Sequence, residues 1–202
     1  MYVDLEDVAF WMDAVRNSEN PYGVLESFWK GQLKSKVWLI ENLKQCVNFD
    51  HPNHIVIHGG WNGVLASLLF NTKINIKHIT NIDIDSETQD PASDICKRQE
   101  IEHRFLQVIQ DMEHYIYSNT PDIVINTSTE HITQDKYDRW FKNIPKDSLI
   151  VLQSNNYYDL PEHVRCFNTV EDFAASSGLG YILVQDTLEL PMYNRFLLIG
   201  RK

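Results

Sequence analysis

The stretch from His54 to Phe70 reads His-Ile-Val-Ile-His-Gly-Gly-Trp-Asn-Gly-Val-Leu-Ala-Ser-Leu-Leu-Phe, and it decides the fold. Its first five residues are rich in β-branched side chains, which is typical of a buried strand. The glycines that follow form a turn, and Val64 to Phe70 continue as an apolar helical segment. A strand that passes through a glycine turn into a helix begins a strand–helix–strand unit, so the stretch predicts an α/β fold.

Four more strand-like segments follow at intervals, and helix-like stretches separate them. The expected strands are Ile76–Asp83, Phe105–Ile109, Asp122–Asn126 and Ser148–Leu152. Helical apolar spacing recurs at Tyr137, Trp140, Phe141 and Ile144, and again from Val170 to Ser177 before Gly178. Strands that alternate with helices require crossover connections, so a mainly parallel, doubly wound sheet is expected.

The two ends of the chain differ from this alternation. Residues 1–50 have helical spacing at Leu5, Val8, Met12 and Val15 and at Leu33, Val37, Ile40 and Leu43, with a break at Asn20–Gly23. At the other end, the segments Tyr181–Thr187 and Arg195–Arg201 are joined by too few residues for a crossover helix, so they should pair antiparallel. We therefore expect one Rossmann-like domain over 1–202, with a helical extension (1–50) and a seven-stranded core (54–202).

Composition narrows the class of protein. The 202 residues carry a formal net charge of −10, which disfavours nonspecific binding to nucleic acid. No apolar run approaches the roughly 20 residues of a membrane helix. The N-terminus is acidic where a signal peptide would be basic, so a cytosolic protein without a membrane partner is expected. Three separated cysteines predict reduced thiols, and the oligomeric state stays open.

The layout from His54 to Lys202, a parallel sheet closed by an antiparallel hairpin, resembles that of the class I S-adenosylmethionine-dependent methyltransferases. In that superfamily a glycine turn of the type G-x-G-x-G follows an acidic residue. Here Gly59 and Gly63 match the outer glycines, Trp61 replaces the middle one, and Ile57 or His58 stands where the acid is usual. The resemblance implies that residues 59–63, Gly59, Gly60, Trp61, Asn62 and Gly63, contact S-adenosylmethionine. A purely structural turn is the alternative.

Two acidic strand ends strengthen this interpretation. Asp83 matches the family's ribose-binding acid, and Ile84 would pack on the adenine. The alternative role for these aspartates is helix capping near Ser86, which suits Asp85 better than Asp83. Farther along, Asp111 resembles the acid that accepts from the adenine amino group, with Met112 lining the base pocket; a solvated loop is the alternative.

The turn also argues against other nucleotides. A pyrophosphate needs close approach to the backbone at the middle glycine, and Trp61 obstructs that approach, so an NAD-dependent oxidoreductase is a weaker hypothesis. No lysine completes a phosphate-binding G-x-x-x-x-G-K-[ST] loop.

The residues after the fourth strand are where the resemblance implies chemistry. Asn126 is retained there and joins the expected cofactor contacts, but no Pro-Pro-aromatic follows it, so methylation of a nucleobase amine is doubtful. Glu130 and His131 are the expected acid–base pair, since histidine titrates near neutrality and an adjacent carboxylate can raise its pKa. Alternatively, Ser128 or Thr129 caps the next helix and Glu130 belongs to its first turn.

Other polar groups carry weaker signals. The segment Gln153–Tyr158 could line a substrate pocket or form a surface loop. The cluster Lys30, Lys34, Lys36 and Lys44 is read as a solvated face, with Lys36 or Ser35 as a possible contact for the methionine carboxylate. His51 and His54 lack a third ligand nearby and the other histidines are scattered, so no metal site is expected.

These observations lead to one main hypothesis, a methyltransferase that acts on a small molecule or a protein side chain with S-adenosylmethionine as cofactor. The alternative is an S-adenosylmethionine-binding protein that cleaves the cofactor, uses another part of it or regulates a partner without methyl transfer.

Overall fold

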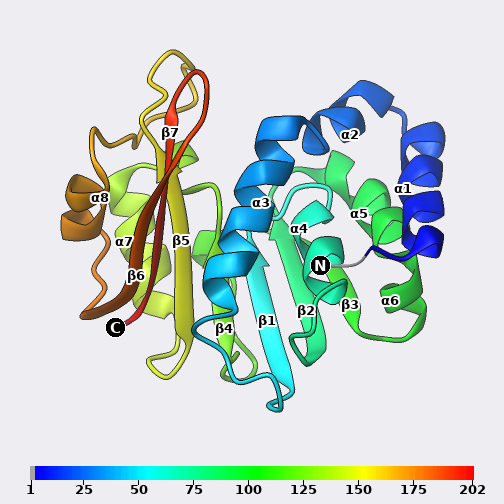
Figure 1. The fold of residues 1–202 in the computed structure, drawn as a ribbon, viewed down its shortest axis with the longest axis horizontal. Helices are drawn as coiled ribbons and strands as arrows, with labels where there is room; N and C mark the ends of the chain where they lie inside the picture. Colours follow the sequence, from blue (N-terminus) through cyan, green and yellow to red (C-terminus); the bar gives the residue numbers. More distant parts are fainter. Residues whose placement is uncertain (1–2) are drawn as a thin grey trace.

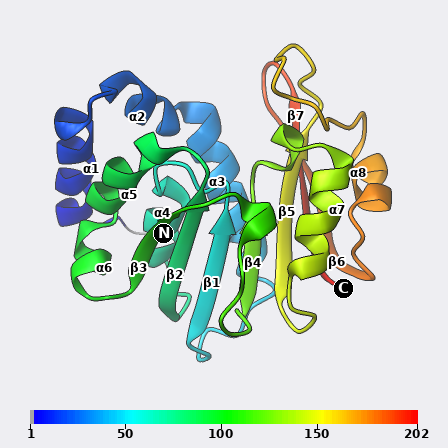
Figure 2. The same ribbon diagram turned by 180° about the vertical axis from the view of Figure 1, so that it is seen from behind.

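A computed structural model describes residues 3–202 and contains a single seven-stranded sheet with helices on both faces (Figures 1 and 2). The strands are β1 (Asn53–His58), β2 (Ile76–Asp83), β3 (Phe105–Ile109), β4 (Ile123–Asn126), β5 (Leu149–Asn155), β6 (Tyr181–Glu189) and β7 (Asn194–Arg201). The α-helices are α1 (Leu5–Asn17), α2 (Pro21–Ser27), α3 (Lys30–Leu43), α4 (Val64–Phe70), α5 (Gln89–Ile95), α6 (Lys97–Ile101), α7 (Gln134–Asn143) and α8 (Val170–Ser176). Three short 3-10 turns are η1 (Ser86–Thr88), η2 (Met112–His114) and η3 (Thr129–His131).

The strand order is β3-β2-β1-β4-β5-β7-β6. The first five strands pair parallel with one another, and β7 pairs antiparallel with both β5 and β6. The chain moves outward from β1 to β3 and then returns to β4 on the other side of β1. This reversal between β1 and β4 is the topological switch point, where open parallel sheets bind their ligands. The predicted doubly wound sheet with its C-terminal hairpin is confirmed.

Alternating side chains of the central strands supply two separate cores. Ile123, Ile125 and Val151 pack with α3, α4 and α5 on one face, while Val124 and Leu152 pack with α7 and α8 on the other. Figure 1 shows α3 in front of the sheet, and Figure 2 shows α7 from the opposite side. Strands buried on both faces explain why they read as continuous apolar runs.

The N-terminal extension is helical as predicted, but two details were wrong. The break at Asn20–Gly23 is the start of α2, because the Asn20 side chain accepts from the Gly23 N–H and Pro21 occupies the first helical position. In α1 only Val15 of the predicted apolar stripe packs against the core, beside Trp11 and Ala14. Asp7 is 1% exposed and binds Arg98, so this ion pair orients the helix and leaves its apolar residues Leu5, Val8 and Met12 in solvent.

None of the helices in residues 3–202 has the length and apolar character needed to cross a bilayer. The three cysteines are free thiols, as predicted.

Candidate functional site

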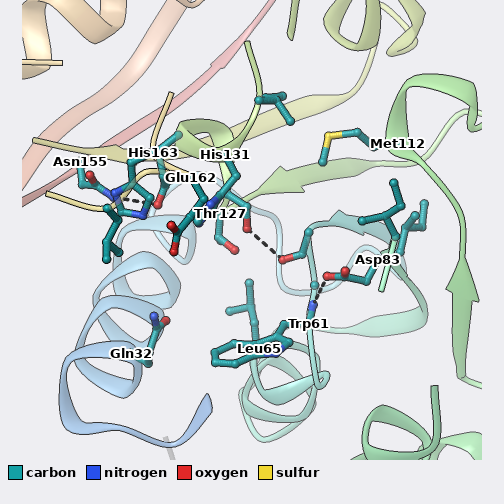
Figure 3. A pocket seen from close by; sticks show the side chains of 18 of the residues that line it. Gln32, Trp61, Leu65, Asp83, Met112, Thr127, His131, Asn155, Glu162 and His163 are labelled. Atoms are coloured by element: carbon teal, nitrogen blue, oxygen red, sulfur yellow. Dashed lines mark hydrogen bonds between the residues drawn. The ribbon is translucent and has the colours of Figure 1, made fainter. Parts of the chain in front are cut away.

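A cavity of about 740 Å³ opens at the carboxyl ends of the parallel strands, beside the switch point (Figure 3). Most residues singled out in the sequence line it: Gly59, Gly60, Trp61, Asp83, Ile84, Asp111, Met112, Glu130 and His131. They come from four separate segments of the chain, so the topology brings together what the sequence separates. Figure 3 shows Asp83 and Met112 at one end and His131 and His163 at the other.

The glycine turn has an unusual backbone that explains its residues. Gly59 has a φ of 62°, and a Cβ atom on Gly60 would lie 1.9 Å from the Asn81 side-chain oxygen. Trp61 also has a positive φ, 49°, which is costly for a residue with a bulky side chain. A positive φ at this position suits glycine, which is the residue at the middle of the G-x-G-x-G pattern that Trp61 interrupts. Trp61 keeps the backbone shape and adds an indole to the cavity wall.

Asp83 ties the turn to the end of β2. One of its carboxylate oxygens accepts from the Trp61 N–H at 2.7 Å, and the other accepts from the Asp85 N–H at 3.1 Å. Asp85 in turn caps η1 by accepting from the Glu87 N–H, which is the capping role that the sequence suggested for it. Asp83 remains on the cavity wall and can accept further hydrogen bonds from a ligand.

Beyond Asp83 the cavity wall presents an exposed apolar side chain, Ile84, and a second acidic residue, Asp111. Ile84 is 69% exposed although it lines the cavity, which leaves its side chain free to pack on a planar ligand. Asp111 caps η2 through the Glu113 N–H, and Met112 follows it on the same wall. The arrangement fits an aromatic ring bounded by a hydrogen-bond acceptor.

Three of the expected cofactor contacts lie outside the cavity wall. Asn62 is buried and donates to the Gly23 carbonyl, while Gly63 caps α4 with a φ of 74°. Asn126 is fully buried, where it accepts from the Ser128 N–H and donates to the Met112 sulfur. These residues hold the walls of the cavity in place and do not reach its interior.

Glu130 is an anchored carboxylate at the other end of the cavity. It is 2% exposed and accepts from Arg195 Nη1 at 2.5 Å and from Asn155 Nδ2 at 2.8 Å, both on one oxygen. Its backbone carbonyl also receives the N–H groups of Val164 and Arg165. The capping alternative does not hold, because α7 is capped by Thr133 and Glu130 lies in η3.

His131 follows Glu130 at the exposed rim of the cavity. Desolvation lowers the pKa of His131 below its ordinary value, and the opposing effect of the Glu130 carboxylate is smaller. The expected upward shift was therefore wrong in sign, because loss of hydration outweighs one neighbouring charge. The imidazole is consequently neutral near pH 7 and can accept a proton.

Lys36 and Ser35 have different surroundings despite being adjacent. Ser35 is buried against β5, where its hydroxyl donates to Gln153 Oε1. Lys36 lines the cavity and donates to Gln32 Oε1 at 2.9 Å. Burial and the nearby Arg195 charge lower the pKa of Lys36 to about 7. Of the lysine cluster, Lys36 is therefore a cavity residue.

Comparison with known proteins supports the topology. No family model and no curated protein matches the chain. Among solved structures it is similar to the N-methyltransferase NodS from Bradyrhizobium japonicum WM9 in complex with S-adenosyl-L-homocysteine, with a TM-score of 0.67 and 11% identity over 96% of this chain and 98% of NodS. The chain has the class I methyltransferase fold.

Other proteins with this fold are larger or were solved with other molecules. PhzM, a pyocyanin biosynthetic protein, matches with a TM-score of 0.65 and 15% identity over 95% of this chain and 62% of PhzM. MtNAS in complex with MTA and tNA matches with a TM-score of 0.63 and 11% identity over 97% of this chain and 70% of MtNAS. The class I methyltransferase fold is thus shared at sequence identities that carry no information on the substrate.

The remaining cavity residues include some that the sequence pointed to and some that it did not. Asn155 and Tyr157 belong to the polar segment after the fifth predicted strand, and they do line the cavity. Arg195 and His163 were not anticipated. Arg195 is the second residue of β7 and reads as an ordinary strand residue. His163 lies in the irregular segment 156–169, whose course depends on its hydrogen bonds to β5 and η3.

Proposed function

We propose that this chain is an S-adenosylmethionine-dependent methyltransferase acting on a small molecule or a protein side chain. The observation that carries the proposal is the Asp83 carboxylate, which is bound to the glycine turn and faces the cavity at the end of β2. The volume of about 740 Å³ lies within the range of small-molecule sites and is large enough for a cofactor and an acceptor group.

The cofactor roles follow from the chemistry of the wall. Asp83 accepts hydrogen bonds from the two ribose hydroxyls, and Ile84 packs on the adenine. Asp111, beside Met112, accepts a hydrogen bond from the adenine amino group. Gly59, Gly60 and Trp61 face the methionine part. Support comes from the fold neighbour NodS, which was solved with S-adenosyl-L-homocysteine. Asn62, Gly63 and Asn126 act by supporting this wall.

Methyl transfer requires little chemistry from the protein beyond alignment and removal of a proton. The acceptor nucleophile forms a bond to the sulfonium methyl carbon. The carbon–sulfur bond breaks with its electron pair on sulfur, and S-adenosylhomocysteine is released. A proton on the acceptor passes to the neutral imidazole of His131. Glu130 is held in place by Arg195 and fixes the position of η3, which carries His131.

The protonation of Lys36 predicts how the affinity for the cofactor depends on pH. A pKa lowered to about 7 means that the cavity gains an ammonium charge as the pH falls from 8 to 6. If Lys36 binds the methionine carboxylate, the affinity for S-adenosylhomocysteine should fall as the pH rises through about 7, because the ammonium form is lost. Calorimetric titrations between pH 6 and 8 measure this, and Lys36→Met should remove the dependence. The matched control Lys34→Met, on the exposed side of α3, should retain it. Equal pH profiles for the wild type and Lys36→Met would exclude Lys36.

His131→Ala tests the chemical step. We expect this variant to bind S-adenosylhomocysteine with the affinity of the wild type and to lose transfer of labelled methyl groups to acceptors in a cell lysate. Removal of a general base typically costs about 100- to 10,000-fold in rate. Undiminished labelling by the variant would remove His131 from the mechanism. Failure of the wild type to bind S-adenosylhomocysteine, or a preference for NAD, would overturn the proposed function.

The alternative is a protein that binds the same cofactor without transferring its methyl group. One observation favours it: the acceptor end of the cavity carries a buried ion pair and lacks the Asn-Pro-Pro-aromatic segment of amine methyltransferases. The lysate experiment distinguishes the two functions, since binding without any labelled product would support the alternative.

A further inference from the structure

Three side chains with metal-ligating atoms converge at the end of the cavity away from Asp83. We refer to Glu130, His131 and His163 as the Glu–His–His triad. One ligand atom from each lies within 4.8 Å of those from the other two. Glu130 and His131 belong to η3, whereas His163 comes from the irregular segment 156–169 (Figure 3). The fold therefore creates a cluster that the sequence, with 31 residues between the two histidines, does not suggest.

The carboxylate of Glu130 has one oxygen that the described residues leave unpaired. Oε1 receives both hydrogen bonds, from Arg195 and Asn155. Oε2 is buried and has no hydrogen-bond donor within reach in residues 3–202. A buried carboxylate oxygen without a partner is costly, so this atom requires a donor or a cation. The Glu130 side chain is 3% exposed and lines the same cavity as His131 and His163.

His163 is held in the tautomer that a metal ligand needs. Its Nδ1 atom lies 2.7 Å from the Tyr157 carbonyl oxygen, which can only accept, so Nδ1 carries the proton. The lone pair is then on Nε2. This pattern, with one ring N–H donated to a backbone carbonyl and the other nitrogen free, is typical of metal-bound histidines.

His131 faces His163 closely. The ring centroids are 4.7 Å apart and the rings are nearly perpendicular, at 81°. Bonds of about 2.0–2.1 Å to a tetrahedral ion would place ligand atoms about 3.3 Å apart. The exposed His131 side chain can supply the small rotation that closes the difference.

The charges around the triad are mixed. Arg195 and Lys36 are cationic, but Arg195 contacts Oε1, the oxygen that already has partners. Glu162 lines the same wall and its charge acts on His131, which adds a second carboxylate to the surroundings. The donor set itself, two imidazoles and one carboxylate, suits Zn²⁺ or Fe²⁺ rather than the oxygen-seeking Mg²⁺ or Ca²⁺.

We propose that the Glu–His–His triad binds one divalent transition-metal ion, of the Zn²⁺ or Fe²⁺ class, with its open coordination positions facing the cavity. The proposal goes beyond methyl transfer and does not depend on it. While an ion is bound, the coordinated nitrogen of His131 has no free lone pair, so the proton transfer to His131 in the proposed function applies to the metal-free chain. Such an ion would act as a Lewis acid on an oxygen atom of whatever molecule occupies this end of the cavity.

Titration of the chelator-treated protein with Co²⁺ alone tests the site, by calorimetry and by visible absorption from the bound ion. We expect one saturable Co²⁺ per chain and competition by Zn²⁺. His163→Ala and His131→Ala should each weaken binding at least tenfold. The matched control His51→Ala removes an exposed histidine just before the amino end of β1, at the end of the parallel strands away from the cavity, and should bind as the wild type does.

The absence of saturable binding, or equal binding by wild type and His163→Ala, would overturn the metal site. Thermal unfolding of each variant verifies that it is folded, and His163→Gln offers a second, milder change. Titration with S-adenosylhomocysteine is performed separately on the same samples. A chain that binds Co²⁺ but not this ligand keeps the metal site and loses the proposed function, and the reverse result loses only the metal site.

Discussion

Asp83→Ala is expected to raise the Kd for S-adenosylhomocysteine about 100-fold or more in calorimetric titrations. Hydrogen bonds to a charged group contribute about 1.5–3 kcal/mol each, and the proposed role gives Asp83 two of them to the ribose. Because about 1.4 kcal/mol corresponds to a tenfold change in affinity, the loss of both exceeds two orders of magnitude. The effect should fall on binding, since Asp83 lies at the opposite end of the cavity from His131.

Asp83 also holds the turn, so the two roles must be separated. Its oxygen accepts from the Trp61 N–H, and Asp83→Ala removes that support as well as the ribose contacts. Asp83→Asn keeps one oxygen for Trp61 and still replaces an acceptor by a donor, so it should bind weakly while unfolding near the wild-type temperature. The neighbouring Asp85→Ala removes only a cap of η1 and should leave affinity unchanged. Equal affinities of the Asp83 and Asp85 variants would contradict the ribose assignment.

The strands of the sheet could be predicted from the sequence because each one is marked by a short local pattern of residues. The boundaries of β2, β3 and α4 are those expected, since each is an apolar run bounded by turn residues. The N-terminal helices were harder. In α1 the face that packs carries Trp11, Ala14 and Val15 together with the buried Asp7. Asp7 binds Arg98, 91 positions away, and hydrophobic spacing contains no trace of that pairing.

The residues of the site also fall into those that the sequence locates and those that it does not. The cavity wall near Asp83 follows strand ends that a family resemblance can locate, so the sequence named three residues that line it, Asp83, Ile84 and Asp111; their contact with the cofactor stays a prediction. At the other end, Arg195 and His163 reach Glu130 and His131 only because β7 inserts beside β5 and the segment 156–169 folds back onto η3. Contacts that depend on long-range pairing leave no pattern in a single sequence, which explains why the Glu–His–His triad was not anticipated.

Glu130→Ala is expected to lower the free energy of unfolding by about 3–5 kcal/mol, because it leaves the Arg195 guanidinium buried without its carboxylate. Arg195 is 8% exposed and Glu130 is 2% exposed, so water cannot replace the lost partner. For a chain of this length the midpoint of thermal unfolding should fall by about 6–20 °C. Denaturant unfolding in the presence of a chelator measures the change without any contribution from a bound ion.

An exposed pair of the same residue types provides the control. Glu102 and Arg104 are 2.9 Å apart with side chains 45% and 41% exposed, so Glu102→Ala should cost no more than about 1 kcal/mol. The double variant Glu130→Leu with Arg195→Met leaves neither charge unpaired and should be more stable than Glu130→Ala. If Glu130→Ala unfolds as Glu102→Ala does, the ion pair with Arg195 does not hold this end of the cavity. The segment 156–169 would still be held by β5 and by the Glu130 backbone carbonyl, a contact that every substitution at this position retains.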